Sequence, residues 1–166
     1  MKPLQPLRDI EVKAKSGSSY PEPFNSRMGN AEWRALGDAF GLTQYGVNLE
    51  TLQPGAQSAL RHWHTLSDEF VYLLEGELVL RTNERESLMT AGSFVGFKAG
   101  ERDGHHLVNR SDQPARILVV GTRAPGDLGF YPDDDLQWCQ NEDGRYPARK
   151  DGRPYWLPGG KPMAET

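Results

Sequence analysis

Residues 42–121 contain a series of short β-strand patterns separated by turn signals. The first pattern, residues 42–52, ends at Gln53-Pro54-Gly55, and seven more follow at residues 59–64, 69–74, 77–82, 87–89, 94–97, 105–109 and 115–121. Short strands at regular spacing predict an antiparallel sandwich or barrel, because a parallel sheet needs long helical crossovers between its strands. The 18 glycines and 12 prolines favour the same all-β architecture, since both residues interrupt helices and populate turns.

The segments on either side of this series lack the strand rhythm. Residues 1–30 are polar and rich in Pro, Gly and Ser, which predicts an extended arm that crosses the surface or pairs with a partner subunit. Residues 31–40 (AEWRALGDAF) are expected to form one or two helical turns that end at Gly41. We therefore expect an arm over residues 1–40, a barrel core over 41–122 and a loop-rich extension of the same domain over 123–166.

Charge and composition exclude several classes of function. The formal charge is −4, and acids and bases are interspersed, so the chain lacks the basic stripe of a nucleic-acid binder. No apolar run is long enough to span a bilayer, and no basic amphipathic helix is apparent. The single cysteine, Cys139, rules out an internal disulfide, and residues 1–20 lack the apolar stretch of a signal peptide. A cytoplasmic protein that binds neither nucleic acid nor membrane is expected.

The four histidines lie in two short stretches of the strand series, and the first stretch suggests a metal site. In a strand, residues two apart share a face, so His62 and His64 point to one side while Trp63 points to the other. Glu69 lies an odd number of residues from His64, which would place it on the wrong face of an unbroken strand. The polar break at residues 65–68 predicts a turn that returns Glu69 to the histidine side.

The second stretch contains two candidates for a further ligand. His105, Leu107 and Asn109 share one strand face, while His106 and Val108 share the other. The alternation alone leaves open which of these faces points into the barrel.

Residues 55–76 resemble the first conserved motif of the cupin superfamily. That motif consists of a glycine, a His-x-His pair, a glutamate and a second glycine. Here these positions are occupied by Gly55, His62, His64, Glu69 and Gly76.

A second cupin motif is also recognisable. Gly92, Gly100, His105 and Asn109 match its glycines, histidine and asparagine, which selects His105 as the fourth ligand by resemblance. The loop before His105 is longer than usual in the family, so His106 remains an alternative.

The resemblance implies a fold, a ligand set and an oligomeric state. The fold would be the cupin double-stranded β-helix, a jelly-roll barrel, with one divalent metal ion bound by His62, His64, Glu69 and His105. Several longer segments are similar to small bacterial single-domain cupins, which are often uncharacterised or labelled sugar-phosphate-isomerase-like. Cupins are commonly dimers, so a homodimer is expected. Lys98 departs from the second motif, where proline is usual, and Ser93 replaces a frequent aspartate.

Three imidazoles and one carboxylate suit zinc, iron, manganese or nickel, and the absence of thiolates argues against a structural zinc site. An ion with an open position can polarise a carbonyl oxygen or, if redox-active, activate dioxygen. We therefore expect an enzyme that acts on a small oxygenated metabolite, by isomerase or lyase chemistry or by dioxygenation. The alternative is a non-catalytic cupin that binds a small molecule or uses its metal to brace the barrel. No general base is identified from the sequence.

The other charged residues have simpler interpretations. Glu50, Glu75 and Glu77 are predicted to be solvated strand or turn charges. Arg61, Arg102 and Lys98 are predicted to be exposed cations at strand ends, and the alternative is that they hold an anionic substrate at the barrel mouth. The acidic run at residues 133–135 is predicted to be a solvated loop or helix cap rather than a second metal site.

Overall fold

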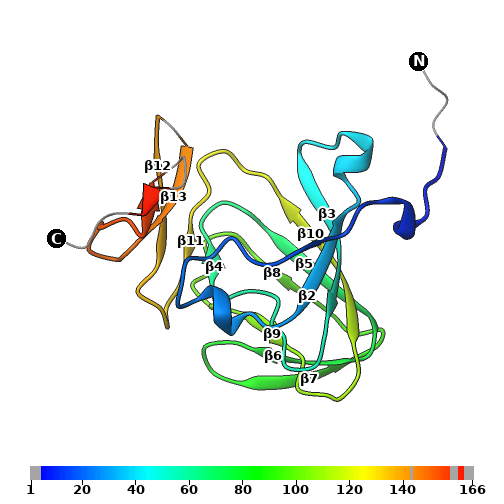
Figure 1. Cartoon of the computed structure of the whole chain (residues 1–166). Coiled ribbons are helices and arrows are strands. Elements are labelled where there is room, and N and C mark those ends of the chain that lie inside the picture. Colours follow the sequence, from blue (N-terminus) through cyan, green and yellow to red (C-terminus); the bar gives the residue numbers. More distant parts are fainter. Residues whose placement is uncertain (1–4, 143, 158–160, 163–166) are drawn as a thin grey trace.

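The computed structural model describes residues 5–142, 144–157 and 161–162, and its secondary structure is almost entirely β (Figure 1). The helical segments are the three short 3-10 turns η1 (Asp9–Glu11), η2 (Asn25–Arg27) and η3 (Asp38–Phe40). The strands are β1 (Lys15–Ser16), β2 (Ala31–Ala35), β3 (Tyr45–Leu52), β4 (Trp63–His64), β5 (Glu69–Glu75), β6 (Glu77–Arg81), β7 (Glu86–Thr90), β8 (Phe94–Phe97), β9 (His106–Val108), β10 (Ala115–Thr122), β11 (Gly129–Phe130), β12 (Gln137–Asn141), β13 (Gly144–Ala148), β14 (Trp156–Leu157) and β15 (Lys161–Pro162). Within the described residues, no helix has the length and apolar character needed to cross a membrane.

Two sheets form the barrel. A six-stranded sheet runs in the order β1-β2-β3-β10-β5-β8, and a three-stranded sheet in the order β7-β6-β9. Neighbouring strands are antiparallel in both sheets, with the longest pairing between β3 and β10. The expected antiparallel all-β fold is therefore confirmed.

The core of the barrel follows from alternation along the strands. In β5, Val71 and Leu73 are fully buried, whereas Phe70 and Leu74 lie on the outer face and are exposed. The buried cluster consists of Leu52, Ala56, Val71, Leu73, Leu78, Met89, Leu107, Ala115 and Ile117. These side chains come from both sheets, so their burial closes the barrel around one core.

The prediction of helical turns over residues 31–40 is wrong for its first half. Ala31–Ala35 form β2, which pairs in register with β3, and only Asp38–Phe40 form a 3-10 turn. The expected end at Gly41 is confirmed, with a left-handed φ of 68°. The local sequence favours a helix, but β3 would otherwise expose an unpaired edge, and strand pairing outweighs that weak preference.

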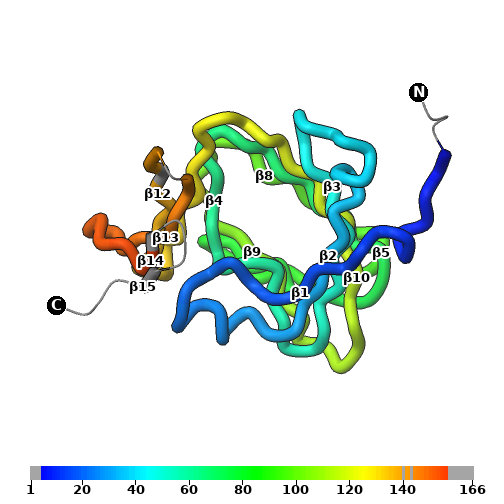
Figure 2. Tube along the Cα trace, turned by 45° about the horizontal axis from the view of Figure 1, so that its top comes forward, coloured from blue at the N-terminus to red at the C-terminus, as the bar shows by residue number. Residues whose placement is uncertain are grey.

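The two flanking segments pack on the barrel. The arm adds β1 to the edge of the six-stranded sheet and runs across the barrel in the view of Figure 2. The C-terminal segment adds β11, which pairs with β4, and the β12–β13 hairpin outside it. A second buried cluster joins both segments to the barrel: Phe24, Met28, Leu60, Tyr131 and Leu136.

Candidate metal centre

His62 and His105 are held opposite each other by an isolated β-bridge. The backbone N–H of His62 donates to the carbonyl oxygen of His105 at 3.1 Å, and the N–H of His105 donates to the carbonyl oxygen of His62 at 2.8 Å. Directly opposed residues of an antiparallel pair project their side chains to the same face. The centroids of the two imidazole rings are accordingly 5.1 Å apart.

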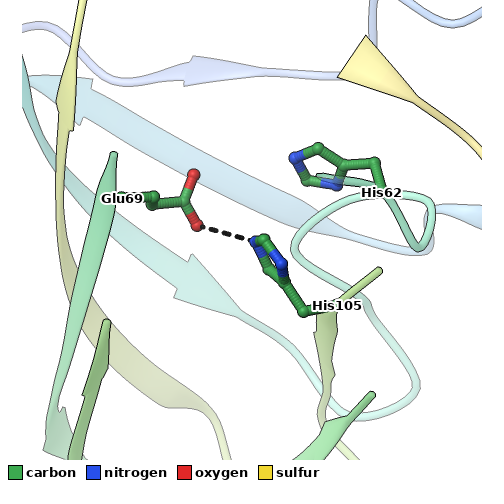
Figure 3. A group of neighbouring side chains, drawn as sticks. All are labelled: His62, Glu69 and His105. Atoms are coloured by element: carbon green, nitrogen blue, oxygen red, sulfur yellow. Dashed lines mark ion pairs between the residues drawn. The ribbon is translucent and has the colours of Figure 1, made fainter. Parts of the chain in front are cut away.

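Glu69 reaches the same point from the start of β5. Its Oε1 lies 3.6 Å from Nε2 of His105, the ion pair drawn in Figure 3. His62, Glu69 and His105 each offer one ligand atom, and these atoms all lie within 4.8 Å of one another. The predicted return of Glu69 to the histidine side is confirmed, because the loop at residues 65–68 separates β4 from β5.

His64 lies beside this three-residue group. Its Nε2 is 3.1 Å from Nε2 of His62, and its Nδ1 is 2.6 Å from Oδ2 of Asp127. His64 therefore contacts the group through His62, from the adjacent strand β4.

The hydrogen bonds of the two rings show which nitrogens carry lone pairs. Nδ1 of His62 lies 2.8 Å from the carbonyl oxygen of Leu60, which can only accept, so this nitrogen carries the proton. Nδ1 of His64 likewise donates to the carboxylate of Asp127. Both Nε2 atoms then present lone pairs to each other, which is repulsive unless a proton or a cation lies between them. A metal ion bound by both Nε2 atoms would remove this repulsion.

His105 has an orientation that fits the same cation. Its Nδ1 is 3.4 Å from the carbonyl oxygen of Asp103, and its ring lies parallel to that of Phe97 with centroids 3.4 Å apart. Its Nε2 is buried and, among the described residues, has no hydrogen-bond partner. A buried nitrogen without a partner is costly, and a metal ion at the common point would satisfy it.

His106, the alternative ligand, points elsewhere. Its Nδ1 lies 3.1 Å from the carbonyl oxygen of Ala59, and it is not among the residues whose ligand atoms converge. The geometry favours His105 over His106.

Burial and neighbouring charges give His62 and Glu69 the protonation states that a metal ion requires. Burial, together with the nearby His105 and His64, lowers the pKa of His62 to about 4, so its ring is neutral near pH 7. Burial opposes ionisation of Glu69, but the rings of His105 and His62 outweigh it and lower the pKa of this carboxyl. Neutral imidazole and ionised carboxylate are the forms that bind metals.

Asp127 is a residue of this centre that the sequence did not reveal. Besides contacting His64, it accepts backbone N–H bonds from Leu66 at 2.8 Å and Ser67 at 3.3 Å. Burial alone would raise the pKa of Asp127, but these donors and His64 lower it. One carboxylate thus orients a histidine and anchors the loop that leads to Glu69. It lies 63 residues from His64 in the chain, and no spacing rule connects them.

The acidic run at residues 133–135 is a structural feature. Asp133 receives two bonds from Arg61, at 2.6 and 2.7 Å, and Asp134 is paired with Arg27 at 2.5 Å. The predicted exposure of Arg61 is wrong, because its side chain is only 9% exposed, and Asp134 is buried rather than solvated. In the part of the chain that the structure describes, the run is not among the groups that could hold a metal.

Two cavities meet at the candidate centre. The mouth cavity, of about 210 Å³, is lined by Trp63, Lys98 and other residues at the open end of the barrel. The inner cavity, of about 200 Å³, lies against the core. Both are lined by Glu69, Phe97 and His105, so an ion at this point would face both spaces.

Comparisons with known proteins agree with the fold. The family profile described as "Cupin domain" matches residues 48–121. A crystal structure from Silicibacter pomeroyi, described as a sugar phosphate isomerase from a cupin superfamily, is 45% identical, with a TM-score of 0.84. The similarity covers 90% of this chain and 96% of that one.

Two further relatives come from Streptomyces. The tetracenomycin polyketide synthase protein TcmJ of Streptomyces glaucescens is 29% identical over 66% of this chain and 71% of its own length. The polyketide cyclase RemF of Streptomyces resistomycificus shares the fold, with a TM-score of 0.59 at 21% identity over 75% of this chain and 83% of that one.

Proposed function

This chain belongs to the cupin superfamily, and on that premise we propose that it is a metal-dependent enzyme acting on a small oxygenated metabolite. The ion would be divalent, and the residues that would hold it are His62, His64, Glu69 and His105. The reaction would be of the isomerase or lyase type.

The observation that supports this proposal most strongly is the convergence of the ligand atoms. Those of His62, Glu69 and His105 lie within 4.8 Å of one another, and Nε2 of His64 faces Nε2 of His62 at 3.1 Å. The Nδ1 atoms of His62 and His64 are occupied by oxygen acceptors, which leaves the Nε2 atoms available for the ion. Such support from outside the ligand set is typical of metal sites.

The roles of the ion, Glu69 and Phe97 follow from their charge and position. When bound, the ion would act as a Lewis acid that polarises a carbonyl oxygen of the substrate. Glu69 supplies the only negative charge of the ligand set, so the centre keeps a net positive charge for an anionic oxygen. Phe97, on the wall shared by both cavities, excludes water from one side of the His105 ring.

The size of the site limits the substrate class. The mouth cavity of about 210 Å³ fits a small metabolite, and it is lined by the cations Arg85 and Lys98 as well as by Glu101 and Asp103. A sugar phosphate or a hydroxy or keto acid suits such a polar site. The description of the Silicibacter pomeroyi protein as a sugar phosphate isomerase supports the same class.

The test is turnover by the metal-loaded protein. The untagged protein, loaded separately with zinc, manganese, nickel or iron(II), would be incubated in deuterium oxide with a panel of sugar phosphates and hydroxy and keto acids. Proton NMR would follow isomerisation and deuterium incorporation next to the carbonyl carbon.

We expect activity in the wild-type protein and in Glu77→Gln, an exposed strand residue, and its loss in Glu69→Gln. Stoichiometric metal without turnover of any compound would contradict the enzymatic proposal in favour of a binding or bracing role. Oxygen uptake by the iron form alone would contradict the isomerase class in favour of dioxygenation.

We also propose that the protein is a homodimer in solution. Light scattering is expected to give twice the chain mass of 18.6 kDa, and a monomer mass would contradict this proposal.

A further inference from the structure

Glu50 carries a carboxyl group that lies inside the barrel. The prediction that it is a solvated strand charge is therefore wrong. It lies on β3 directly opposite Ile117 of β10, which is fully buried in the core. Opposed residues of neighbouring strands share a face, so the Glu50 side chain points inward. It lines the inner cavity together with His62, Glu69 and His105.

This carboxyl group has no partner of its own. Among the described residues, none forms a hydrogen bond or ion pair with the carboxyl group of Glu50, in contrast to that of Glu69, which is paired with His105. The titratable residues that line the same cavity are Glu69 of β5, His62 and His105 of the bridge, and His106 of β9, whose ring is turned toward the carbonyl oxygen of Ala59. Burial, followed by the charge of Glu69, raises the pKa of Glu50 to about 7.

The position of Glu50 also connects the cavity to a second surface. Asn48, Glu50 and Ser58 line both the inner cavity and a groove of about 240 Å³. The arm residues 17–20 form one wall of that groove, on the segment that crosses the barrel in Figure 2. Glu50 therefore lies between the candidate centre and solvent, on a route separate from the mouth.

We propose that Glu50 is the proton-transfer residue of the site, exchanging its proton with solvent through the groove beneath the arm. This inference rests on the proposed function. With the substrate carbonyl at the candidate centre, where the two cavities meet, the neighbouring carbon lies in the inner cavity that Glu50 lines. The carboxylate takes a proton from that carbon, and the electron pair of the C–H bond forms the double bond of an enediolate, with the charge on the carbonyl oxygen. Glu50 returns the proton to the former carbonyl carbon while a hydroxyl proton passes to the former carbonyl oxygen, so no oxidant or reductant is consumed.

The first test compares Glu50→Gln with Glu77→Gln in the metal-loaded protein. Glu50→Gln should bind metal with unchanged stoichiometry and lose deuterium incorporation and isomerisation by at least about 100-fold, the usual contribution of a positioned acid–base group. Glu77→Gln should match the wild type. Turnover by Glu50→Gln at the wild-type rate would overturn the role of Glu50 and leave the proposed function intact. No turnover by the wild-type protein would overturn both.

The second test needs no substrate. Calorimetric titration with zinc near pH 7, in buffers of different ionisation enthalpy, counts the protons released per ion bound. A cation at the centre favours the ionised form of a carboxyl facing the same cavity, so the wild type should release more protons than Glu50→Gln. Equal release by the two proteins would show that Glu50 does not respond to the ion and would overturn the proposal.

Discussion

Two clusters of titratable side chains flank the strand that carries the His-x-His pair, and they differ in how their charges are satisfied. In the loop at residues 133–135, Asp133 and Asp134 are paired with Arg61 and Arg27, although Oδ2 of Asp134 is buried without a hydrogen-bond partner among the described residues. At the candidate metal centre, Nε2 of His105 is buried without a hydrogen-bond partner among the described residues, and the Nε2 atoms of His62 and His64 face each other.

The difference shows that chemistry is indicated by ligand atoms that converge on one point rather than by the number of charges or by a single unpaired atom. Arg61 and His62 are neighbours in the chain, yet the first completes a structural ion pair and the second contributes to an incomplete site. A cluster whose charges are paired within the chain stabilises the fold. Buried ligand atoms that converge on one point form a site for a cation.

The largest expected effect is the loss of metal binding in Glu69→Gln. The substitution removes the only charged ligand and leaves the shape of the site unchanged. Zinc affinity should therefore fall by more than the roughly 10–100-fold loss that is typical when a residue outside the ligand set is substituted. Isothermal titration calorimetry measures the zinc affinity, with Glu77→Gln as the control. Unchanged zinc affinity in Glu69→Gln would mean that the converging residues are not a metal site and that this difference between the two clusters does not exist.

Arg61→Met should act on the other cluster. It leaves Asp133 and the carbonyl oxygen of Gly104 without their donor, and we expect the free energy of unfolding to fall by about 2 kcal/mol. Urea denaturation measures this fall, and Arg110→Met, which breaks an exposed pair with Glu86, should change it little.

The folded Arg61→Met protein should bind zinc as tightly as the wild type. A loss of zinc affinity comparable to that of Glu69→Gln would show that the acidic loop belongs to the functional site.

Asp127→Asn should weaken metal binding without removing a ligand. The amide cannot stabilise the His64 ring as the carboxylate does, and zinc affinity should fall by about 10–100-fold. Asp112→Asn, at an exposed position, provides the matched control in the same calorimetric titration. If Asp127→Asn binds zinc like the control, then His64 does not contribute to the centre.

The smallest effect concerns the pH dependence of the metal-free protein. The folded-state pKa of Glu50, about 7, lies above the ordinary value of 4.5, so the folded protein binds more protons between these values. The stability contributed by protonated Glu50 is thus present below pH 4.5 and lost as the pH rises through 7.

Glu50→Gln cannot lose this contribution, so its stability relative to the wild type should rise by about 1–2 kcal/mol between pH 5 and pH 8. The depressed pKa of His62, about 4, makes both proteins less stable as the pH falls from 6.5, and this effect cancels in the comparison. Thermal unfolding of the two metal-free proteins at both pH values measures the difference. A difference that does not change with pH would place Glu50 in contact with solvent.

The sequence predicted the parts of the molecule that depend on local periodicity. The alternation of His62 and His64, and the turn that restores the phase of Glu69, follow from strand geometry, and the structure brings Glu69 to the predicted side. The choice between His105 and His106 was not available from alternation, because it depends on which face of the strand meets the barrel interior.

The features that the sequence did not reveal depend on tertiary pairing. β2 forms because the edge of β3 is available, and Glu50 is half-buried because its strand position faces the core. Asp127 reaches His64 through the packing of the C-terminal segment on β4. None of these contacts has a signal in local composition, since the partners are separated along the chain and meet only in the folded barrel.

The most direct test of the metal centre is elemental analysis of the untagged protein, alongside His62→Ala, His105→Ala and His106→Ala variants whose folding is checked by circular dichroism. We expect about one equivalent of a transition metal in the wild type and in His106→Ala, and its loss in the other two variants. No metal in the wild-type protein, even after reconstitution, would contradict the account, as would full occupancy in His105→Ala.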